Sequence, residues 1–130
     1  MIFLDTSAIY AWVDKADPNH RAAVERLEAL LNQEEELLTH NYILVESVAL
    51  LQARLGHSTA AKFAKDSAIF LVEWVDKDLH ASAIREWERS GNRRLSLVDH
   101  ISFLVMKRRD VVTAFAFDSD FKTAGFRLFA

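Results

Sequence analysis

Two short apolar runs, each ending at an aspartate, constrain the fold of this chain more than any other feature. The first covers residues 2–5 and ends at Asp5, and the second covers residues 111–117 and leads into Asp118. Both contain the β-branched and aromatic residues that favour strands. If both are strands of a parallel sheet, the aspartates lie at the carboxyl ends of strands, where such sheets bind ligands. A charge there, beside a dry core, is costly unless a cation meets it.

Strand-like and helix-like patterns alternate along the chain, which predicts an α/β fold with a parallel sheet covered by helices on both faces. We expect strands at residues 2–5, 37–40, 69–75 and 111–117, and a last one near 127–129. We expect helices at residues 7–13, 17–31, 41–55, 58–67, 76–91, 96–109 and 120–124.

Capping signals set several of these boundaries. Asp17 before Pro18 predicts a helix start, because proline fits the first helical position. Asn41 is expected to cap the next helix and Gly56 to end it. Ser96 is expected to cap a later one.

The bulk properties exclude several protein classes. The 130 residues suffice for one core, and no linker or change of composition divides them, so we expect one domain, residues 1–130. The absence of cysteine excludes disulfides and thiolate metal sites. No apolar run approaches the roughly 20 residues that cross a bilayer, and the first residues lack the basic segment of a secretory signal. We therefore expect a cytoplasmic protein without membrane contact. The net charge of −3 argues mildly against a dedicated nucleic-acid binder, because such proteins are usually basic.

Two further acids stand out from the solvated surface residues. Glu46 lies in a helix that is apolar on nearly every side, with no basic residue three or four positions away, so it is poorly placed for solvent. Asp99 lies in the first turn of a helix after Ser96, where the helix dipole favours an acid. Each has an ordinary explanation, as a carboxylate at the core rim and as a helix-capping acid. Asp5 and Asp118 could likewise cap the helices that follow them.

Taken together, these four acids indicate a cation site. Asp5 and Asp118 converge at one sheet edge if their strands are parallel neighbours, and helices starting near that edge can add Glu46 and Asp99. Carboxylates so close would repel one another and raise their pKa values, which a divalent cation relieves. An all-oxygen set without cysteine or paired histidines favours Mg²⁺ or Mn²⁺ over zinc.

These residues resemble the signature of the PIN-domain family, and in particular the compact VapC-type ribonuclease toxins of type II toxin–antitoxin systems. The resemblance covers essentially the whole chain. It rests on the order and spacing of the four acids in the segments 4–8, 42–47, 95–103 and 116–121. It implies a three-layer α/β/α PIN-like fold with a short central parallel sheet.

The resemblance also implies an activity, that of a metal-dependent endoribonuclease. Such an enzyme hydrolyses RNA phosphodiester bonds with metal-activated water and leaves a 5′-phosphate and a 3′-hydroxyl. Asp5, Glu46, Asp99 and Asp118 would be the catalytic residues and the Mg²⁺ or Mn²⁺ ligands, with Asp120 as a further candidate ligand, directly or through water. Hydroxyls that orient the cluster or its waters would come from Thr6 or Ser7, and from Ser96.

Partners follow from the same resemblance: an RNA substrate, a cognate antitoxin protein and a second copy of the chain in a homodimer. Arg93 and Arg94 are the best candidates for binding RNA, because they approach the site along the chain just before Ser96. A dimer could pool such residues along one groove, which would reduce the objection from net charge.

Three other readings compete with this one. A haloacid-dehalogenase-type phosphatase needs a second acid two residues after the first, where this chain has Ser7. A response-regulator receiver needs adjacent acids after the first strand and a lysine at a late strand end, and neither is evident. The main alternative is a PIN-fold RNA-binding or assembly module with weak or no nuclease activity, against which the full acidic set argues.

Overall fold

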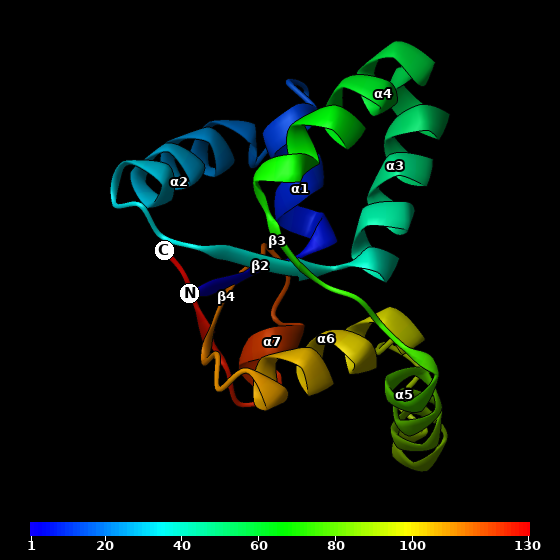
Figure 1. Ribbon diagram of the computed structural model, residues 1–130. Helices are drawn as coiled ribbons and strands as arrows, with labels where there is room; N and C mark the ends of the chain where they lie inside the picture. The colour runs from blue at the N-terminus through cyan, green and yellow to red at the C-terminus, as the bar shows by residue number, and fades with distance from the viewer.

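A computed structural model describes residues 1–130 as a parallel sheet between two layers of helices (Figure 1). Four helices lie on one face of the sheet: α1 (Thr6–Val13), α2 (His20–Asn32), α3 (Asn41–Leu55) and α4 (His57–Asp66). The other layer holds α5 (Lys77–Ser90), α6 (Leu97–Arg108) and the short α7 (Asp120–Thr123). A 3₁₀ turn, Ser67–Ile69, follows α4. The predicted three-layer α/β/α class is therefore confirmed.

The sheet has five strands in the order β3-β2-β1-β4-β5, and every neighbouring pair is parallel. Their bounds are β1 (Ile2–Leu4), β2 (Leu37–His40), β3 (Leu71–Glu73), β4 (Thr113–Phe115) and β5 (Arg127–Leu128). The chain moves outward from β1 through β2 to β3, then crosses to β4 on the other side of β1. The strand order thus reverses between β1 and β4, which is where open α/β sheets form ligand sites.

Side-chain caps begin several helices as the sequence predicts. The Ser96 hydroxyl accepts a 3.1 Å hydrogen bond from the Asp99 N–H at the start of α6. Asp76 accepts 2.8 Å from the Leu79 N–H at the start of α5. Gly56 follows α3 with a φ of +95°, a conformation that glycine adopts without strain. Side-chain hydrogen bonds therefore set the starts of α5 and α6, and α6 carries the candidate residue Asp99.

Two predicted helix starts are wrong. Asp17 accepts a 2.8 Å hydrogen bond from the Asn19 N–H, and this turn delays α2 until His20. Asn41 is the first residue of α3 rather than its cap. His40 takes that role, because its Nδ1 accepts 3.2 Å from the Ile43 N–H. The Asn41 side chain instead accepts 2.6 Å from the Val75 N–H.

The hydrophobic core comprises 26 buried residues drawn from both helical layers and from the sheet. Phe3, Leu38 and Phe115 of the central strands are almost completely buried. These side chains hold β1 between β2 and β4, and so fix where the strands end. No helix combines the length and apolar character needed to cross a membrane.

Candidate active site

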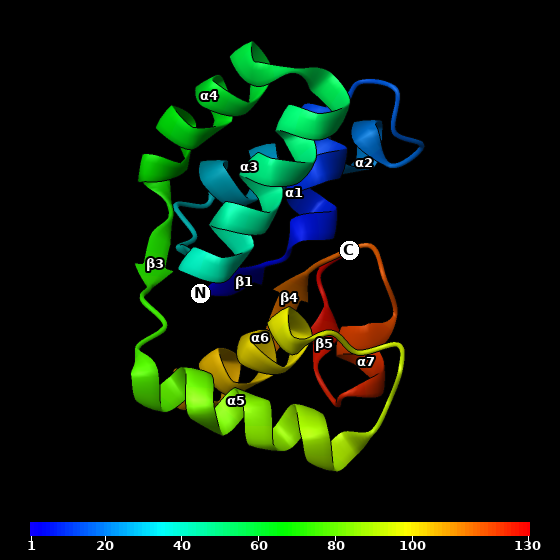
Figure 2. The same ribbon diagram turned by 90° about the vertical axis from the view of Figure 1, so that its right-hand side faces the viewer.

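The two strand-end aspartates lie on neighbouring strands. β1 pairs with β4 in parallel, with Phe3 opposite Ala114 and Leu4 opposite Phe115. The Asp5 N–H extends this pairing by donating a 3.1 Å hydrogen bond to the Phe115 carbonyl. In Figure 2 the first turns of α1 and α6 approach this edge of the sheet from opposite faces, beside the segment that follows β4. The predicted meeting of the two strand ends is therefore present.

Asp5 is a buried carboxylate, with a relative exposure of 5%. It caps α1 by accepting hydrogen bonds of 3.1 Å from the Ser7 N–H and 2.7 Å from the Ser7 hydroxyl. Burial raises the pKa of Asp5 to about 7. The Ser7 bonds oppose this rise, and the nearby carboxylates of Asp118 and Asp99 add to it. The prediction that Asp5 caps the helix that follows it is therefore confirmed.

Asp118 also interacts with neighbouring carboxylates. Partial burial raises its pKa above the usual range, and the charges of Asp120 and Asp99 raise it further. Its Oδ1 accepts a 3.1 Å hydrogen bond from the Asp120 N–H, which fixes the turn after β4. The structure therefore brings Asp5, Asp99 and Asp118 close enough to interact, with Asp120 beside them.

A reciprocal capping box holds Asp99 at the start of α6. The Asp99 carboxylate accepts 2.9 Å from the Ser96 N–H, and the Ser96 hydroxyl accepts 3.1 Å from the Asp99 N–H. The capping explanation for Asp99 is therefore correct, and the same carboxylate also acts on the pKa values of Asp5 and Asp118. Capping restrains its side chain where α6 meets the sheet edge.

Glu46 stands apart from these three acids. It is exposed on α3, so the expectation that this position is poorly placed for solvent is wrong. The reason is that α3 leaves part of its apolar surface uncovered, with neighbouring Val45 exposed to 69%. The Glu46 Oε1 accepts a 2.7 Å hydrogen bond from the Thr6 hydroxyl, and Thr6 follows Asp5 directly. Glu46 is thus tied to the site through Thr6.

The two candidate RNA-binding arginines have different surroundings. The Arg94 guanidinium lies 3.7 Å from Asp120 Oδ1, which places a cation at the rim of the acids. Arg93 is exposed and lines a separate cavity of about 490 Å³ beside Trp87 and Leu95. Only Arg94 therefore contacts the acidic group.

The donor chemistry of the acids fits a divalent cation. Asp5, Asp99 and Asp118 offer carboxylate oxygens only, and their mutual repulsion favours a positive charge between them. No three His, Asp or Glu side chains are arranged to hold a metal ion as they stand. The site therefore has the charge and ligand type for Mg²⁺ or Mn²⁺ without a preformed cage.

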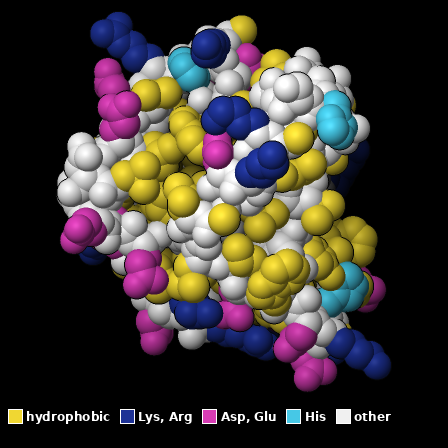
Figure 3. Space-filling model, turned by 45° about the horizontal axis from the view of Figure 1, so that its top comes forward, with side chains coloured by type: hydrophobic (Ala, Val, Ile, Leu, Met, Phe, Trp, Pro, Cys, Tyr) yellow, Lys and Arg dark blue, Asp and Glu magenta, His cyan; other side chains and the backbone are white.

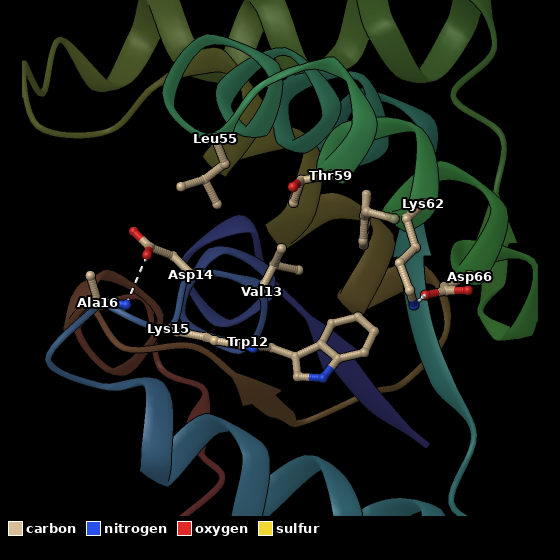
Figure 4. Close-up of a pocket in the computed structure, with 10 residues that line it drawn as sticks. Trp12, Val13, Asp14, Lys15, Ala16, Leu55, Thr59, Lys62 and Asp66 are labelled. Carbon is tan, nitrogen blue, oxygen red and sulfur yellow. Dashed lines mark hydrogen bonds and ion pairs between the residues drawn. The ribbon is translucent and has the colours of Figure 1, made fainter.

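The cavity of about 660 Å³ between α1 and α4 is a separate feature (Figure 4). Five of its ten lining residues are hydrophobic, among them Trp12, Val13 and Phe63. Its Asp66 is paired with Lys62 at 2.8 Å. None of the candidate acids lines this cavity, so the candidate chemistry lies elsewhere, at the strand ends.

Arg26 of α2 contacts the ring of Phe117, which the sequence did not predict. Its guanidinium carbon lies 5.1 Å from the centre of the Phe117 ring, one residue before Asp118. The sequence gives no signal for this contact, because it depends on how α2 packs against the segment after β4.

Comparison with known proteins gives consistent results. A family model described as PIN domain matches residues 2–127. The 23S rRNA-specific endonuclease VapC20 of Mycobacterium tuberculosis, in strains CDC 1551 / Oshkosh and ATCC 25618 / H37Rv, is 38% identical over 128 residues. The match covers 97% of this chain and 95% of VapC20.

Solved structures agree with this match. The crystal structure of M. tuberculosis VapC20, described as a Sarcin-Ricin loop cleaving toxin, has a TM-score of 0.85 and 35% identity. That similarity covers 97% of this chain and 96% of the other. FitAcB from Neisseria gonorrhoeae has a TM-score of 0.69 at 18% identity, covering 100% of this chain and 97% of the other, which shows a shared fold alone.

Proposed function

The chain belongs to the PIN-domain family, and on that premise we propose that it is a metal-dependent endoribonuclease, the VapC-type toxin of a toxin–antitoxin pair. The observation that carries this proposal is the buried Asp5 carboxylate at the β1–β4 strand ends, with Asp99 and Asp118 acting on its pKa. A buried acid beside two others is costly for a purely structural site. The alternative of an RNA-binding module without nuclease activity explains RNA contact but not this arrangement.

The cation in this proposal is Mg²⁺ or Mn²⁺. Asp5, Asp99 and Asp118 would hold it, with Glu46 and Asp120 as further ligands, directly or through water. When bound, a divalent cation lowers the pKa of water and offsets charge on the leaving oxygen. A cation near Asp5 also favours the ionised carboxylate, against the burial that raises its pKa to about 7.

Three hydroxyl side chains restrain the acids in this proposal. Ser7 fixes the Asp5 carboxylate at 2.7 Å, and Thr6 fixes Glu46 at 2.7 Å. The Ser96 hydroxyl and N–H complete the capping box that restrains Asp99. Such restraints matter because small displacements of positioned groups lower the rate. Arg94 is paired with Asp120 at 3.7 Å, but its side chain is 77% exposed and would also contact an RNA phosphate; Arg93 precedes it on the exposed loop.

The proposed substrate is ribosomal RNA. VapC20 is a 23S rRNA-specific endonuclease described as cleaving the Sarcin-Ricin loop, and it matches this chain over almost its full length. We extend that substrate class to this chain, and with it a cytoplasmic location, where ribosomes are found.

The proposed protein partners are a cognate antitoxin and a second copy of the chain. Support for the homodimer comes from apolar side chains that are exposed on the face covered by the layer of α1 to α4 (Figure 3). A groove of about 360 Å³ between α3 and α4 is lined by Leu44, Val45, Val48 and Ala64. Uncovered apolar surface of this kind is typical of protein–protein contacts.

Cleavage of RNA with and without metal tests the proposal. Ribosomes and a sarcin–ricin hairpin RNA are incubated with the protein in Mn²⁺ or Mg²⁺, with a chelator in parallel. We expect cleavage that the chelator abolishes and that Asp5→Asn lowers at least about a hundredfold. Asp17→Asn is the matched control, because Asp17 only forms the turn before α2. Cleavage that persists in chelator would overturn the metal mechanism, and RNA binding without any cleavage would favour the binding-module alternative.

A further inference from the structure

We propose that Arg26, stacked on the ring of Phe117, binds a backbone phosphate of the RNA next to the scissile bond. The inference rests on the proposed ribonuclease function and adds to it an element, α2, that carries none of the candidate acids. The observations behind it are a cation without a carboxylate partner, an aromatic ring tied to the site, and the order of contacts along one segment.

The Arg26 guanidinium has no carboxylate partner. The chain contains six ion pairs, and none of them includes Arg26. Its helical neighbours three and four residues away are alanines and a leucine, which offer no charge. Arg21 on the same helix differs, because its Nε lies 3.5 Å from Glu25 and its side chain is 93% exposed. Arg26 is half-buried, so its charge is held against the protein rather than left in open solvent.

The ring beneath Arg26 is anchored to the acidic site. The Phe117 N–H donates a 3.0 Å hydrogen bond to the Ser7 hydroxyl, which in turn donates 2.7 Å to Asp5. The guanidinium carbon lies 5.1 Å from the ring centre, a distance at which the π face attracts a cation. A guanidinium stacked on a ring keeps its N–H groups available at its edge, where they can bind phosphate oxygens in pairs.

Arginines contact both ends of the segment 117–120. Arg26 lies over Phe117 at one end of the segment, and Arg94 lies 3.7 Å from Asp120 at the other. Asp118, a proposed metal ligand, comes between them in the chain. Two arginines from separate elements therefore contact the residues on either side of Asp118 along the chain. Together they place two positive charges beside this segment, in a chain whose net charge of −3 otherwise opposes binding to RNA.

Equilibrium binding to RNA tests the role of Arg26. A fluorescent sarcin–ricin hairpin RNA is titrated with Asp5→Asn protein, chosen because its cleavage is expected to be slow, in Mg²⁺ at several KCl concentrations. Adding Arg26→Gln should weaken binding roughly tenfold and lower the slope of log affinity against log salt by about one. Arg21→Gln is the matched control and should leave both quantities unchanged. Arg26→Lys keeps the charge without the planar fork and should fall between the two.

Phe117→Leu provides a second test that keeps the arginine. It removes the ring that holds Arg26, so we expect weaker binding with an unchanged salt slope. Thermal unfolding of each variant checks that the fold is retained. Equal effects of Arg26→Gln and Arg21→Gln, or an unchanged affinity for Arg26→Gln, would overturn the inference while RNA cleavage by the unaltered chain stands. Failure of the unaltered chain to cleave RNA at all would overturn the proposed function, and this inference with it.

Discussion

The Ser7 hydroxyl donates a 2.7 Å hydrogen bond to the buried Asp5 carboxylate. The same oxygen accepts 3.0 Å from the Phe117 N–H, which belongs to the segment after β4. One hydroxyl therefore ties the two strand ends together. Its bond to Asp5 is also the main effect that opposes the raised pKa of that carboxyl group.

Replacing Ser7 with alanine should impair cleavage and shift its pH profile. Without the hydroxyl, Asp5 loses a bond that favours its ionised form, so the pKa of Asp5 rises further above about 7. We expect a rate reduction of about tenfold at pH 7 that shrinks as the pH is raised. Ser7→Thr keeps the hydroxyl and serves as the control. An alanine variant with the unaltered pH profile would show that Ser7 does not act through Asp5.

The raised pKa of Asp5 predicts an unusual pH dependence of stability in the absence of metal. The folded protein binds the Asp5 proton more tightly than the unfolded chain does, so protonation of Asp5 stabilises the fold. This contribution to the free energy of unfolding is complete below pH 3.8 and is lost as the pH rises to about 7. Asp5→Asn removes the penalty of a buried charge. In chelator at pH 8 it should raise the free energy of unfolding by up to about 4 kcal/mol.

Urea unfolding at pH 4 and pH 8 measures this effect. The gain from Asp5→Asn should be large at pH 8 and close to zero at pH 4. Mg²⁺ should narrow the difference at pH 8 by binding to the unaltered protein. Asp17→Asn, an acid-to-amide change in the turn before α2, should show no such dependence. An equal effect of Asp5→Asn at both pH values would contradict the buried charge.

The sequence predicts the position of Asp5 and Asp118 well because neighbouring parallel strands end at one edge, whatever the details of packing. Glu46 is harder to place. Periodicity shows that α3 is apolar on several sides, but not which side the rest of the chain leaves uncovered, and Val45 beside it is 69% exposed. Arg26 depends on how α2 lies against the segment after β4, which no local pattern encodes. Predictions from chain topology and from the caps of α5 and α6 therefore succeeded, whereas those that depend on which side of a helix the rest of the chain covers did not.

The role of His40 as a helix cap was likewise not predicted from the sequence. Its burial leads to a prediction about stability in acid. It is completely buried. Its Nδ1 accepts 3.2 Å from the Ile43 N–H, and its Nε2 lies 2.9 Å from the Ser102 hydroxyl. Burial lowers the pKa of His40 to about 3. Since the unfolded chain takes up a proton near pH 6.5, the stabilising contribution is complete above that pH and is lost towards pH 3.

We therefore expect up to about 5 kcal/mol of acid destabilisation from this one side chain. His40→Asn keeps an acceptor for the Ile43 N–H and cannot be charged. It should therefore have a lower free energy of unfolding at pH 7.5, and that free energy should change less between pH 6.5 and pH 4. The measurement is made in the Asp5→Asn background, because Asp5 has the opposite pH dependence. His57→Asn, an exposed histidine at the start of α4, is the control. An undiminished slope in His40→Asn would rule out His40 as the source.

A comparison of two helix caps separates stability from positioning. Ser96 caps α6, which carries Asp99, and Asp76 caps α5, which carries no candidate acid. Ser96→Ala and Asp76→Ala should each lower the free energy of unfolding by about 1 kcal/mol, because each leaves a helix N–H without its partner. Only Ser96→Ala also removes half of the capping box at Asp99, so that the backbone N–H of residue 96 is left to hold the Asp99 carboxylate alone. We expect it to lower the rate of RNA cleavage by about tenfold or more, while Asp76→Ala cleaves at the unaltered rate at a temperature where both variants are folded. Equal cleavage by the two variants would mean that the capping box stabilises α6 without positioning Asp99 for the reaction.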